Sequence, residues 1–561
     1  CGWLGRGIIN KSLQKRSWVV AQRQHDDLIQ HLLLLHSVDT PENFFNPRYS
    51  DRSSPERLPN MASAVERIKY AIDHNQTIGI YGDYDCDGVP GTALLSRSLK
   101  MIGVEAKVYI PRREVGYGLN RKGIDWLKSE SVDLLITVDN GTTATEEVEY
   151  ARGLNIDVLI TDHHEPHSTV PKAIVVNPKL QESQYPTDDL CGTAVVFKLV
   201  ERLSAHYPNQ LNERWLKWQL DLVALATICD MVELTGENRL LATFGLTVLR
   251  QTKNAGLRAL FNVAGIDPKT LTASTVGFGL GPRINAAGRM EEDPMLGFRL
   301  LTTDNVDEAT TIAQTLHRLN SERQDMLLSA LRQAEIQLKD EAPAMAIVLQ
   351  NPDWNAGIVG LIASKLLERY HKPTFIFDAK TGKGSARSIK AYPLPNVLAQ
   401  LSEHFVSYGG HAMAGGMSLK KDAFLAFKKD LINHANVTIG QESITPHLYI
   451  DADVGLNEVN VLIAKKLNEF EPFGVGNPKP LFVARNLTAR DVKVMGNDRK
   501  HLRGLLSQSN VHIPFVAFGF AERKGELSNG QFDVVGRMEL NHWNGHTTAE
   551  LHVLDVDNSG H

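Results

Sequence analysis

The stretch IGIYGDYDCDG (78–88) decides the fold class that we expect for this chain. Its first four residues, IGIY (78–81), have the composition of a short buried strand, and a glycine-bounded turn follows directly. That turn carries Asp83, Asp85 and Asp87 at alternate positions. Three carboxylates this close repel one another at neutral pH unless solvent or cations offset the repulsion. The stretch therefore predicts a divalent-metal site at the end of a strand.

Two other interpretations of this turn must be weighed. The pattern D-x-D-x-D-G also begins an EF-hand calcium loop, which needs a bidentate Glu at its twelfth position. Counted from Asp83, that position is the apolar Leu94, and a strand rather than a helix precedes the turn. Both differences argue against an EF-hand. A solvated acidic turn without a metal stays open on this stretch alone.

Three further apolar runs within the next 150 residues carry acidic or imidazole side chains. They are DLLITVDNG (133–141) with Asp139, DVLITDHHEP (157–166) with Asp162, His163 and His164, and DLVALATICDMVEL (221–234) with Asp230. Each run has the composition of a buried strand. The carboxyl ends of parallel strands share one edge of a sheet, so these polar side chains are expected to converge there.

Together with other motifs in the same order, these runs resemble the DHH phosphoesterase superfamily, and within it the exonucleases of single-stranded DNA. The other motifs include RREVGYGL (112–119), LCGTAVVFKL (190–199), GPRINAAGRM (281–290), WNAGIVGLIASKLLERYHKP (354–373), GSARSI (384–389), GGHAMAGG (409–416), EPFGVGNPKP (471–480) and NHWNG (541–545). The resemblance implies a two-metal-dependent exonuclease. It would hydrolyse single-stranded DNA from 5′ to 3′ in DNA repair and recombination.

The resemblance also implies a set of metal ligands for two Mn²⁺ or Mg²⁺ ions, which carboxylates and imidazole suit. The implied ligands are Asp83, Asp85, Asp87, Asp139, His163 and Asp230, with Asp139 as the bridge. Asp83 is the open case. Some relatives carry a His four residues before the position of Asp85, where this chain has Tyr81, and Asp83 could take its place.

Four residues are expected to serve the reaction directly, namely Asp139, Asp162, His164 and His411. Asp162 would orient a ligand histidine from behind. His164 would either contact the phosphate or support another group. His411 in GGHAMAGG would close the cleft from a second domain, although this Gly-rich stretch could equally reflect tight helix packing.

The loop GKGSARS (382–388) predicts a phosphate site, because glycine lets the backbone approach closely and Arg binds two oxygens at once. With the resemblance, Ser385, Arg387 and Arg112 would form a pocket for a 5′ phosphate. The spacing after Pro111 is one residue shorter than expected, so Arg113 is an alternative to Arg112. Three more residues would face the cleft, namely Arg283, Asn285 and Arg289.

The domain organisation follows from changes in pattern along the chain. We expect an α/β fold. A parallel-sheet DHH domain is joined by a long helix to a second α/β DHH-associated domain, and a C-terminal OB-fold β-barrel follows. The expected ranges are 1–55 for an N-terminal helical segment, 56–255 for the DHH domain, 256–340 for the connecting region, 341–438 for the second domain and 439–561 for the barrel.

The connecting region should contain one long helix from about Val306 to Asp340, because apolar residues recur there at helical spacing. Asn305 with Glu308 three residues later suits a capping box. At about 1.5 Å per residue such a helix would be roughly 50 Å long, which suits a connection between domains.

The barrel combines aromatic residues with a basic cluster, a pairing suited to single-stranded nucleic acid. Trp543, in an NHWNG turn, is the best candidate for an exposed stacking residue. The other aromatics are Phe482, Phe515, Phe518 and Phe520, and at least half of them should be core. The cluster comprises Arg485, Arg490, Lys493, Arg499, Lys500 and Arg503.

The amino-acid composition excludes few classes of protein. The chain has 561 residues and a net charge of −5, which does not by itself indicate a nucleic-acid binder. No apolar run is long enough to span a bilayer, so we expect no membrane contact. We also expect a cytoplasmic protein that acts as a monomer. Cys1, Cys86, Cys191 and Cys229 have no C-x-x-C spacing, which disfavours a zinc site, and Cys86 and Cys229 are interpreted as packing residues.

The resemblance alone adds a single-strand-binding protein and a DNA helicase as partners. Two other functions were weighed. The extra barrel and the chain length argue against a DHH nanoRNase or small-phosphoester hydrolase. The retained acidic ligands and His163 argue against a catalytically silent DNA-binding scaffold.

Overall fold

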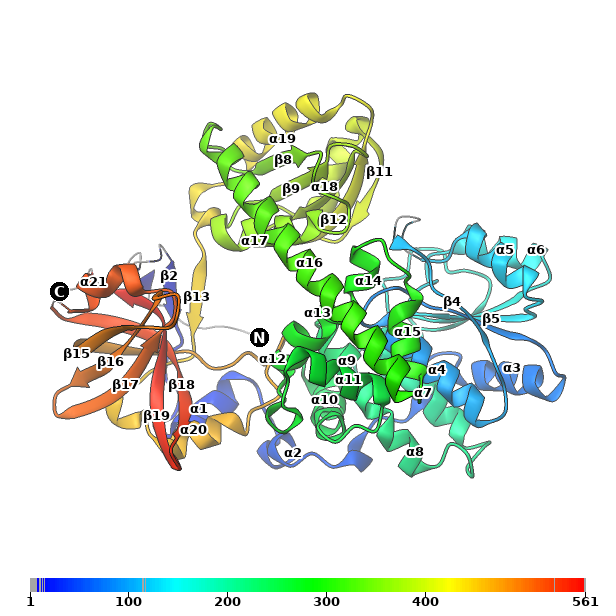
Figure 1. Cartoon of the computed structure of the whole chain (residues 1–561), viewed down its shortest axis with the longest axis horizontal. Helices are drawn as coiled ribbons and strands as arrows, with labels where there is room; N and C mark the ends of the chain where they lie inside the picture. The colour runs from blue at the N-terminus through cyan, green and yellow to red at the C-terminus, as the bar shows by residue number, and fades with distance from the viewer. Residues whose placement is uncertain are drawn as a thin grey trace.

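A computed structural model describes residues 8–558, apart from residues 10, 11, 13, 15, 114, 115, 117 and 529. Figure 1 shows three bodies: a first α/β domain at the right, a second α/β domain at the top and a β-barrel at the left. Helix α16 (Val306–Lys339) runs between the two α/β domains. Among the described residues, no helix combines the length and hydrophobicity that crossing a bilayer requires.

The first α/β domain is built on a five-stranded parallel sheet with the strand order β4-β3-β5-β6-β7. Its strands are β3 (Ile78–Tyr81), β4 (Lys107–Tyr109), β5 (Leu134–Val138), β6 (Asp157–Thr161) and β7 (Ile174–Val176). Helices α3 (Met61–Asp73), α4 (Gly88–Met101) and α7 (Gly192–Ser204) share one hydrophobic core with the sheet. Helices α5 (Arg121–Ser129) and α6 (Thr145–Gly153) contribute to a second core. Both faces of the sheet are therefore buried, which explains the continuous apolar strands.

One sequence expectation is wrong in this domain. The run 221–234 was expected to be a strand that ends near Asp230, but the chain forms helix α9 (Leu220–Cys229), and Asp230 is its C-cap residue. The helix is buried on nearly all sides, so its sequence has no polar face. A short continuous apolar run does not distinguish a buried strand from a buried helix.

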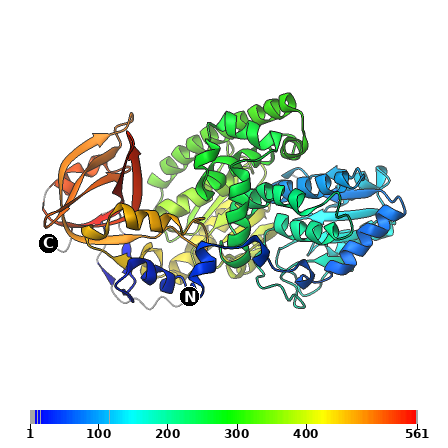
Figure 2. The same ribbon diagram turned by 90° about the horizontal axis from the view of Figure 1, so that it is seen from below.

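Helices follow α7 up to the end of the connecting region. They are α8 (Glu213–Trp218), α9, α10 (Gly236–Leu249), α11 (Ala255–Ala264), α12 (Ala273–Thr275), the π-helical turn η5 (Val276–Leu280), α13 (Gly281–Ile284), α14 (Ala286–Arg289) and α15 (Met295–Thr302). Figure 2 shows this helical layer between the barrel and the parallel sheet.

The long connecting helix is confirmed. Helix α16 has 34 residues, and the side chain of Asn305 accepts hydrogen bonds from the backbone N–H groups of Asp307 and Glu308. The reciprocal half of the expected capping box is replaced, because Glu308 accepts from Thr303 Oγ1 and Thr303 Oγ1 in turn accepts from Asn305 N–H.

The second α/β domain contains a mixed five-stranded sheet with the order β11-β12-β10-β9-β8. Its elements are β8 (Ile347–Asn351), α17 (Val359–Tyr370), β9 (Thr374–Asp378), β10 (Lys383–Arg387), α18 (Leu394–Gln400), β11 (Phe405–Gly410), β12 (Ala414–Leu419) and α19 (Phe424–Thr438). Residues 409–416 therefore form a hairpin turn between β11 and β12, which excludes the alternative of tight helix packing around His411.

The C-terminal domain is a closed five-stranded barrel, as expected for an OB fold. Its strands are β15 (Phe482–Met495), β16 (His501–Gln508), β17 (Val511–Ala517), β18 (Phe532–Trp543) and β19 (His546–Asp557), and β15 pairs with β18 to close it. Helices α20 (Val461–Asn468) and α21 (Lys524–Ser528) accompany them, and the short β14 (Ala452–Asp453) extends β15.

The N-terminal segment is less helical than its sequence suggests, and it is attached to the barrel. Strand β2 (Ser17–Val20) pairs with β1 (Ile8–Ile9) and, in parallel, with β13 (His447–Ile450). Helix α1 (Leu28–Leu35) buries Leu28, Leu32 and Leu33 in the core of the barrel, and α2 (Pro41–Phe45) follows it. Strands that pair across such a distance in sequence carry no local pattern from which their pairing could be predicted.

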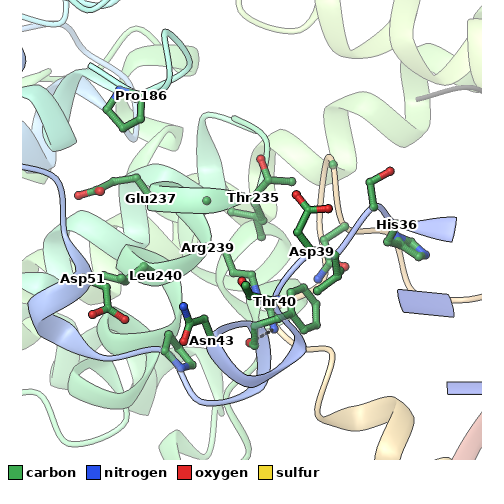
Figure 3. Close-up of a pocket in the computed structure, with 18 of the residues that line it drawn as sticks. His36, Asp39, Thr40, Asn43, Asp51, Pro186, Thr235, Glu237, Arg239 and Leu240 are labelled. Atoms are coloured by element: carbon green, nitrogen blue, oxygen red, sulfur yellow. Dashed lines mark hydrogen bonds between the residues drawn. The ribbon is translucent and has the colours of Figure 1, made fainter. Parts of the chain in front are cut away.

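Arg239 of α10 joins three parts of the chain. Its guanidinium donates to the backbone carbonyls of Phe470 and Glu471, each at 2.9 Å, and lies 3.8 Å from the centre of the Phe44 ring. Burial lowers the pKa of Arg239 to about 10. It lines a cavity of about 470 Å³ between the N-terminal segment and α10 (Figure 3). This junction fixes the barrel and the N-terminal segment against the first α/β domain.

Candidate active site

The ends of three neighbouring strands bring most of the predicted polar residues together. The loop after β3 carries Asp83, Asp85 and Asp87, Asp139 follows β5, and the two histidines follow β6. Asp139 has a positive φ of 64°, a conformation uncommon for residues other than glycine and asparagine, and one found at functional sites. Helix α9 adds Asp230 from the side.

The Nε2 atom of His163 lies at the centre of this cluster. It is 3.1 Å from Asp139 Oδ1, 3.7 Å from Asp87 Oδ2 and 3.7 Å from Asp230 Oδ2. This buried nitrogen makes no hydrogen bond within the described part of the chain. A buried polar atom without a hydrogen bond is costly, unless another group such as a cation occupies the space between these ligands.

Asp87 is fixed by the first residues of helix α7. Its carboxylate accepts hydrogen bonds from the backbone N–H groups of Gly192 (2.6 Å) and Thr193 (2.8 Å). Gly192 is also in close contact with Asp139, since a Cβ atom at this glycine would lie 2.7 Å from the Asp139 Cβ. Glycine at position 192 therefore allows α7 to approach both carboxylates.

Asp162 lies behind the two histidines. Its Oδ1 accepts from the backbone N–H of His163 at 2.7 Å and contacts His164 Nδ1 at 2.8 Å, while Oδ2 accepts from Thr142 N–H. Burial raises the pKa of Asp162, but the hydrogen bond and charge of His164 outweigh it, so the net pKa is well below the usual range. Burial lowers the pKa of His164, and its bond to Asp162 reverses this and raises it. Asp162 thus holds the ring of His164, whereas it contacts only the backbone of His163, the histidine expected to bind metal.

The cluster is electrostatically strained without cations. Burial, followed by repulsion from Asp87 and Asp85, raises the pKa of Asp230 to about 9. Burial and the same neighbours raise the pKa of Asp139 well above its usual range. Carboxylate and imidazole atoms lie within 4.8 Å of one another in two groups, one of Asp83, Asp85 and Asp139 and another of Asp87, His163 and Asp230. A third group, of Asp139, His163 and His164, shares one residue with each of them. This donor set fits two neighbouring hard divalent cations such as Mn²⁺ or Mg²⁺.

The positions of Asp83 and Tyr81 bear on the question of which of them can bind metal. The Tyr81 hydroxyl donates to the Gly118 carbonyl and accepts from Asn120, so it points away from the acidic cluster. Asp83 Oδ1 is buried and has no hydrogen-bond partner. Burial, followed by Asp85, raises the pKa of Asp83 well above its usual range. This geometry supports a ligand role for Asp83 in place of the missing histidine.

Comparisons with known proteins decide the family. Family models match three stretches: "DHH family, N-terminal domain" at residues 77–227, "DHHA1 domain" at 344–436 and "RecJ OB domain" at 450–555. The chain is 36% identical to the single-stranded-DNA-specific exonuclease RecJ of Bacillus subtilis over 94% of this chain and 68% of that protein. It is 35% identical to the RecJ of Escherichia coli, over 76% of this chain and 78% of that one. The chain belongs to the RecJ family.

Solved RecJ structures agree with this assignment. The crystal structure of RecJ from Thermus thermophilus in complex with Mn²⁺ matches with a TM-score of 0.82 and 28% identity, covering 95% of this chain and 76% of that one. The Mg²⁺ complex of the same RecJ matches with a TM-score of 0.75 and 27% identity, covering 95% and 75%. The acidic cluster described above offers ligands that suit the divalent cations of a RecJ-family protein.

A second polar pocket lies on the second α/β domain. Arg387 Nη1 donates to Ser385 Oγ at 3.0 Å, and both residues face the first turn of α17. A Cβ atom at Gly360 in that turn would lie 3.2 Å from Ser385 Oγ and 3.4 Å from Arg387 Nη2. A hydroxyl, a guanidinium and helix N–H groups at one place fit a phosphate.

Arg113, rather than Arg112, lies near Arg387 and Arg289. Burial, followed by the charge of Arg113, lowers the pKa of both Arg387 and Arg289, to about 10 for Arg289, so the three arginines are neighbours. Arg112 instead donates to the Glu291 carbonyl at 3.3 Å from an exposed position. The structure therefore favours the alternative raised by the spacing after Pro111. Residues 114, 115 and 117 of the same RecJ-like motif lie outside the described residues.

Arg323 was missed by the sequence analysis. This arginine of α16 is buried, its Nε has no hydrogen-bond partner, and its charge contributes to the lowered pKa of Arg289. It occurs four residues after the buried Leu319, on the apolar face of the helix. A charged residue on an otherwise apolar helical face is the signal that could have found it.

Three other predicted residues have different surroundings. Arg283 donates to His317 Nδ1 and to the Gly279 carbonyl, so it braces the connecting region. The Oδ1 atom of Asn285 is buried without a hydrogen-bond partner. His411 is exposed at the turn between β11 and β12, next to the strand pair that carries Ser385 and Arg387.

The barrel presents two of the five expected aromatic residues to solvent. Trp543 is 73% exposed and Phe518 is 55% exposed, whereas Phe482, Phe515 and Phe520 are buried in the core. Within the basic cluster, Arg485 is paired with Asp453 and Asp533. Lys500 is paired with Asp498 at 3.7 Å, while Lys493, Arg503 and Trp543 are exposed.

The cysteines other than Cys1, which lies outside the described residues, are free thiols. Cys86 and Cys191 are buried, and Cys229 is half-buried. Burial raises the pKa of Cys191 well above its usual range. A thiol held protonated in this way suits a packing residue rather than a metal ligand.

Proposed function

We propose that this RecJ-family protein hydrolyses single-stranded DNA from the 5′ end, releasing nucleotides from 5′ to 3′. The observation that carries the proposal is the arginine pocket of Arg113, Arg289 and Arg387, with Arg289 lying close enough to Asp85 of the metal cluster for their charges to interact. A pocket that takes a terminal phosphate fixes which bond lies over the metal site. The names of the RecJ relatives support the substrate class.

The roles of the residues follow from their positions. Arg387, Ser385 and Arg113 would bind the terminal phosphate, which carries more negative charge than an internal diester. Asp162 would hold the ring of His164 and the backbone of His163. His164 lies 3.8 Å from Asp139 Oδ1 through its Nδ1 and is partly exposed, so it could contact the scissile phosphate. His411, exposed on the neighbouring hairpin, would approach the substrate from the second domain.

Bound cations supply Lewis-acid charge and an activated water for in-line attack at phosphorus. They would be held by Asp83, Asp85, Asp87, Asp139, His163 and Asp230. Binding of two cations would remove the repulsion that raises the pKa values of Asp139 and Asp230. The complete ligand set argues against a catalytically silent scaffold, and the barrel argues against a nanoRNase.

The finer features of the proposal concern partners and assembly. We expect a monomer that works with a single-strand-binding protein and a DNA helicase in DNA repair and recombination in the cytoplasm, as the family resemblance implies. Light scattering tests the monomer, and binding of each purified partner tests the association.

The direct test compares 5′-labelled single-stranded DNA, duplex DNA and RNA of one sequence, each with Mn²⁺, Mg²⁺ or EDTA. The proposal expects release of labelled mononucleotide from single-stranded DNA with either metal and none in EDTA. Equal cleavage of blunt duplex DNA, or release of nucleotides from the 3′ end first, would contradict it.

A further inference from the structure

Two free cysteines lie next to expected metal ligands in the acidic cluster. Cys86 lies between Asp85 and Asp87, and Cys229 directly precedes Asp230. Asp87 is the N-cap residue of α4, and Asp230 is the C-cap residue of α9. One carboxylate oxygen of Asp87 lies within 4.8 Å of one carboxylate oxygen of Asp230. The ends of the two helices therefore meet, and each end carries a cysteine one residue before its aspartate.

The thiols of these two cysteines are in contact. A hydrogen bond with Cys229, followed by burial, raises the pKa of Cys86 well above its usual range. Cys86 belongs to the main core of the first α/β domain, and Cys229 packs against the same core. Gly281 of α13 leaves space for the Cys229 thiol, because a Cβ atom at this glycine would lie 2.5 Å from the sulfur. Two free thiols in contact are the starting arrangement for a disulfide.

Cys229 is the more accessible of the two thiols. It is half-buried and lines a cavity of about 650 Å³ between the end of α9, the π-helical turn η5 and residues 471–479. Cys86 and Cys191 are buried, and Cys191 has a hydroxyl partner, Thr227 Oγ1, at 3.5 Å. A small oxidant such as a peroxide therefore reaches Cys229 first and finds the Cys86 thiol behind it.

The turn that carries Cys86 is tied to the carboxylates of the cluster. Asp85 Oδ1 accepts hydrogen bonds from the backbone N–H groups of Asp87 at 2.9 Å and of Gly88 at 3.1 Å. A covalent bond holds two sulfur atoms closer together than any non-bonded contact, so the turn after β3 and the end of α9 must shift to form it. A displacement of about 1 Å in an active site can lower the rate by about 10²-fold.

We propose that Cys86 and Cys229 form a reversible disulfide that displaces Asp87 and Asp230 and thereby switches the nuclease off. Hydrogen peroxide is the oxidant. The sulfur of Cys229 attacks one peroxide oxygen, the O–O bond breaks, and the second oxygen leaves with the thiol proton as water, so that Cys229 becomes a sulfenic acid. The sulfur of Cys86 then attacks the sulfenic sulfur, the S–S bond forms, and the hydroxyl leaves with the Cys86 proton as a second water. A dithiol reductant restores both thiols by exchange.

The test is treatment with hydrogen peroxide in EDTA, removal of the peroxide with catalase, and single-turnover cleavage of single-stranded DNA after Mn²⁺ is added. The unmodified protein should lose activity by about 10²-fold, and dithiothreitol should restore it. Cys86→Ser and Cys229→Ser should each keep their own initial activity, because neither can form the disulfide. Cys191→Ser is the matched control, since it retains a hydroxyl toward Thr227 and should be inactivated as fully as the unmodified protein.

A second measurement detects the disulfide without any assay of activity. The oxidised unmodified protein is digested in the absence of reductant, and the peptides are weighed by mass spectrometry. One product should join the peptides of Cys86 and Cys229, should be lighter by two hydrogen atoms than their sum, and should disappear on reduction. This measurement needs no variant, so it decides the matter even if a serine substitution destabilises the core.

Any of three results would overturn the disulfide switch. The first is the absence of the joined peptide from the oxidised unmodified protein. The second is a joined peptide with unchanged activity, which would separate the disulfide from the nuclease. The third is inactivation of Cys86→Ser to the same extent as the unmodified protein, which would assign the loss to oxidation of Cys229 alone. None of these results bears on the direction of cleavage, which end-labelled DNA tests separately.

Discussion

The Nε2 atom of His163 lies 3.1 Å from the Oδ1 atom of Asp139, although the two residues follow different strands of the parallel sheet. Asp87 and Asp230 surround the same nitrogen. An imidazole nitrogen without a hydrogen bond among three carboxylates is best explained by cations between them.

Asp139→Ala should abolish cleavage and leave DNA binding intact. The carboxylate of Asp139 would bridge both cations, so its loss should lower the single-turnover rate by at least about 10²-fold. Rates with saturating Mn²⁺ and binding in EDTA measure the two effects. Asp353→Ala, at an exposed site in the second α/β domain, is the control. Near-normal turnover of Asp139→Ala would contradict the assignment of the acidic cluster as the catalytic metal site.

Asp162→Asn should weaken metal binding without removing a ligand. Asp162 accepts hydrogen bonds from the backbone N–H of His163 and from the ring of His164, and loss of such a supporting group typically costs about 10–100-fold in metal affinity or activity. We expect the activity to be partly recovered at high Mn²⁺ concentration. A titration of activity against Mn²⁺ checks this. An unchanged metal requirement would show that Asp162 does not position the ligands.

Arg113→Ala and Arg387→Ala should each reduce cleavage of 5′-phosphorylated DNA more than cleavage of 5′-hydroxyl DNA. Both side chains would bind the terminal phosphate, and the structure places their charges close together. Arg112→Ala is the matched control, because Arg112 contacts the Glu291 carbonyl instead. If activity falls equally on the two substrates, these arginines contact the DNA backbone in general and not the terminal phosphate. If Arg112→Ala has the larger effect on 5′-phosphorylated DNA, Arg112 and not Arg113 binds the terminal phosphate.

Lys493 and Arg503 should contribute to the salt dependence of DNA binding. They lie directly opposite each other on β15 and β16, and both are exposed. Like charges at such positions destabilise a sheet, which suggests that a ligand uses them. Replacing both by Ala should flatten the slope of log Kd against log salt by about 1.4, at roughly 0.7 per phosphate contact on single strands. Binding measured across several salt concentrations tests this, and an unchanged slope would exclude the pair from the interface.

Arg239→Met should loosen the junction between the barrel and the first α/β domain. It removes charge-assisted hydrogen bonds to the Phe470 and Glu471 carbonyls, each worth about 1.5–3 kcal/mol. We expect faster proteolysis between residues 440 and 480 and an earlier unfolding transition. Arg258→Met, at an exposed position of α11, serves as the control. Identical proteolysis of both variants would show that Arg239 does not hold the junction.

The sequence was sufficient where the pattern is local. Asn305 and the apolar spacing of 306–340 predicted α16, and the aspartates after IGIY marked the metal site. These features depend on the periodicity and capping of neighbouring residues. The α/β fold class and the barrel were also predicted from local patterns, and the structure confirms both.

The sequence was insufficient where the outcome depends on tertiary contacts. Asp230 follows an apolar run that is compatible with both strand and helix, and only its packing among other helices selects α9. The pairing of β2 with β13 and the direction of the Arg113 side chain are likewise set by distant residues. Arg323 could have been noticed, but its neighbour Arg289 comes from another segment.

The most direct test of the account is the order in which nucleotides leave a single-stranded oligonucleotide that carries different labels at its two ends. With Mn²⁺, the account predicts early release of the 5′ label as a mononucleotide, late release of the 3′ label and no release in EDTA. Early release of the 3′ label, or release that persists in EDTA, would contradict it.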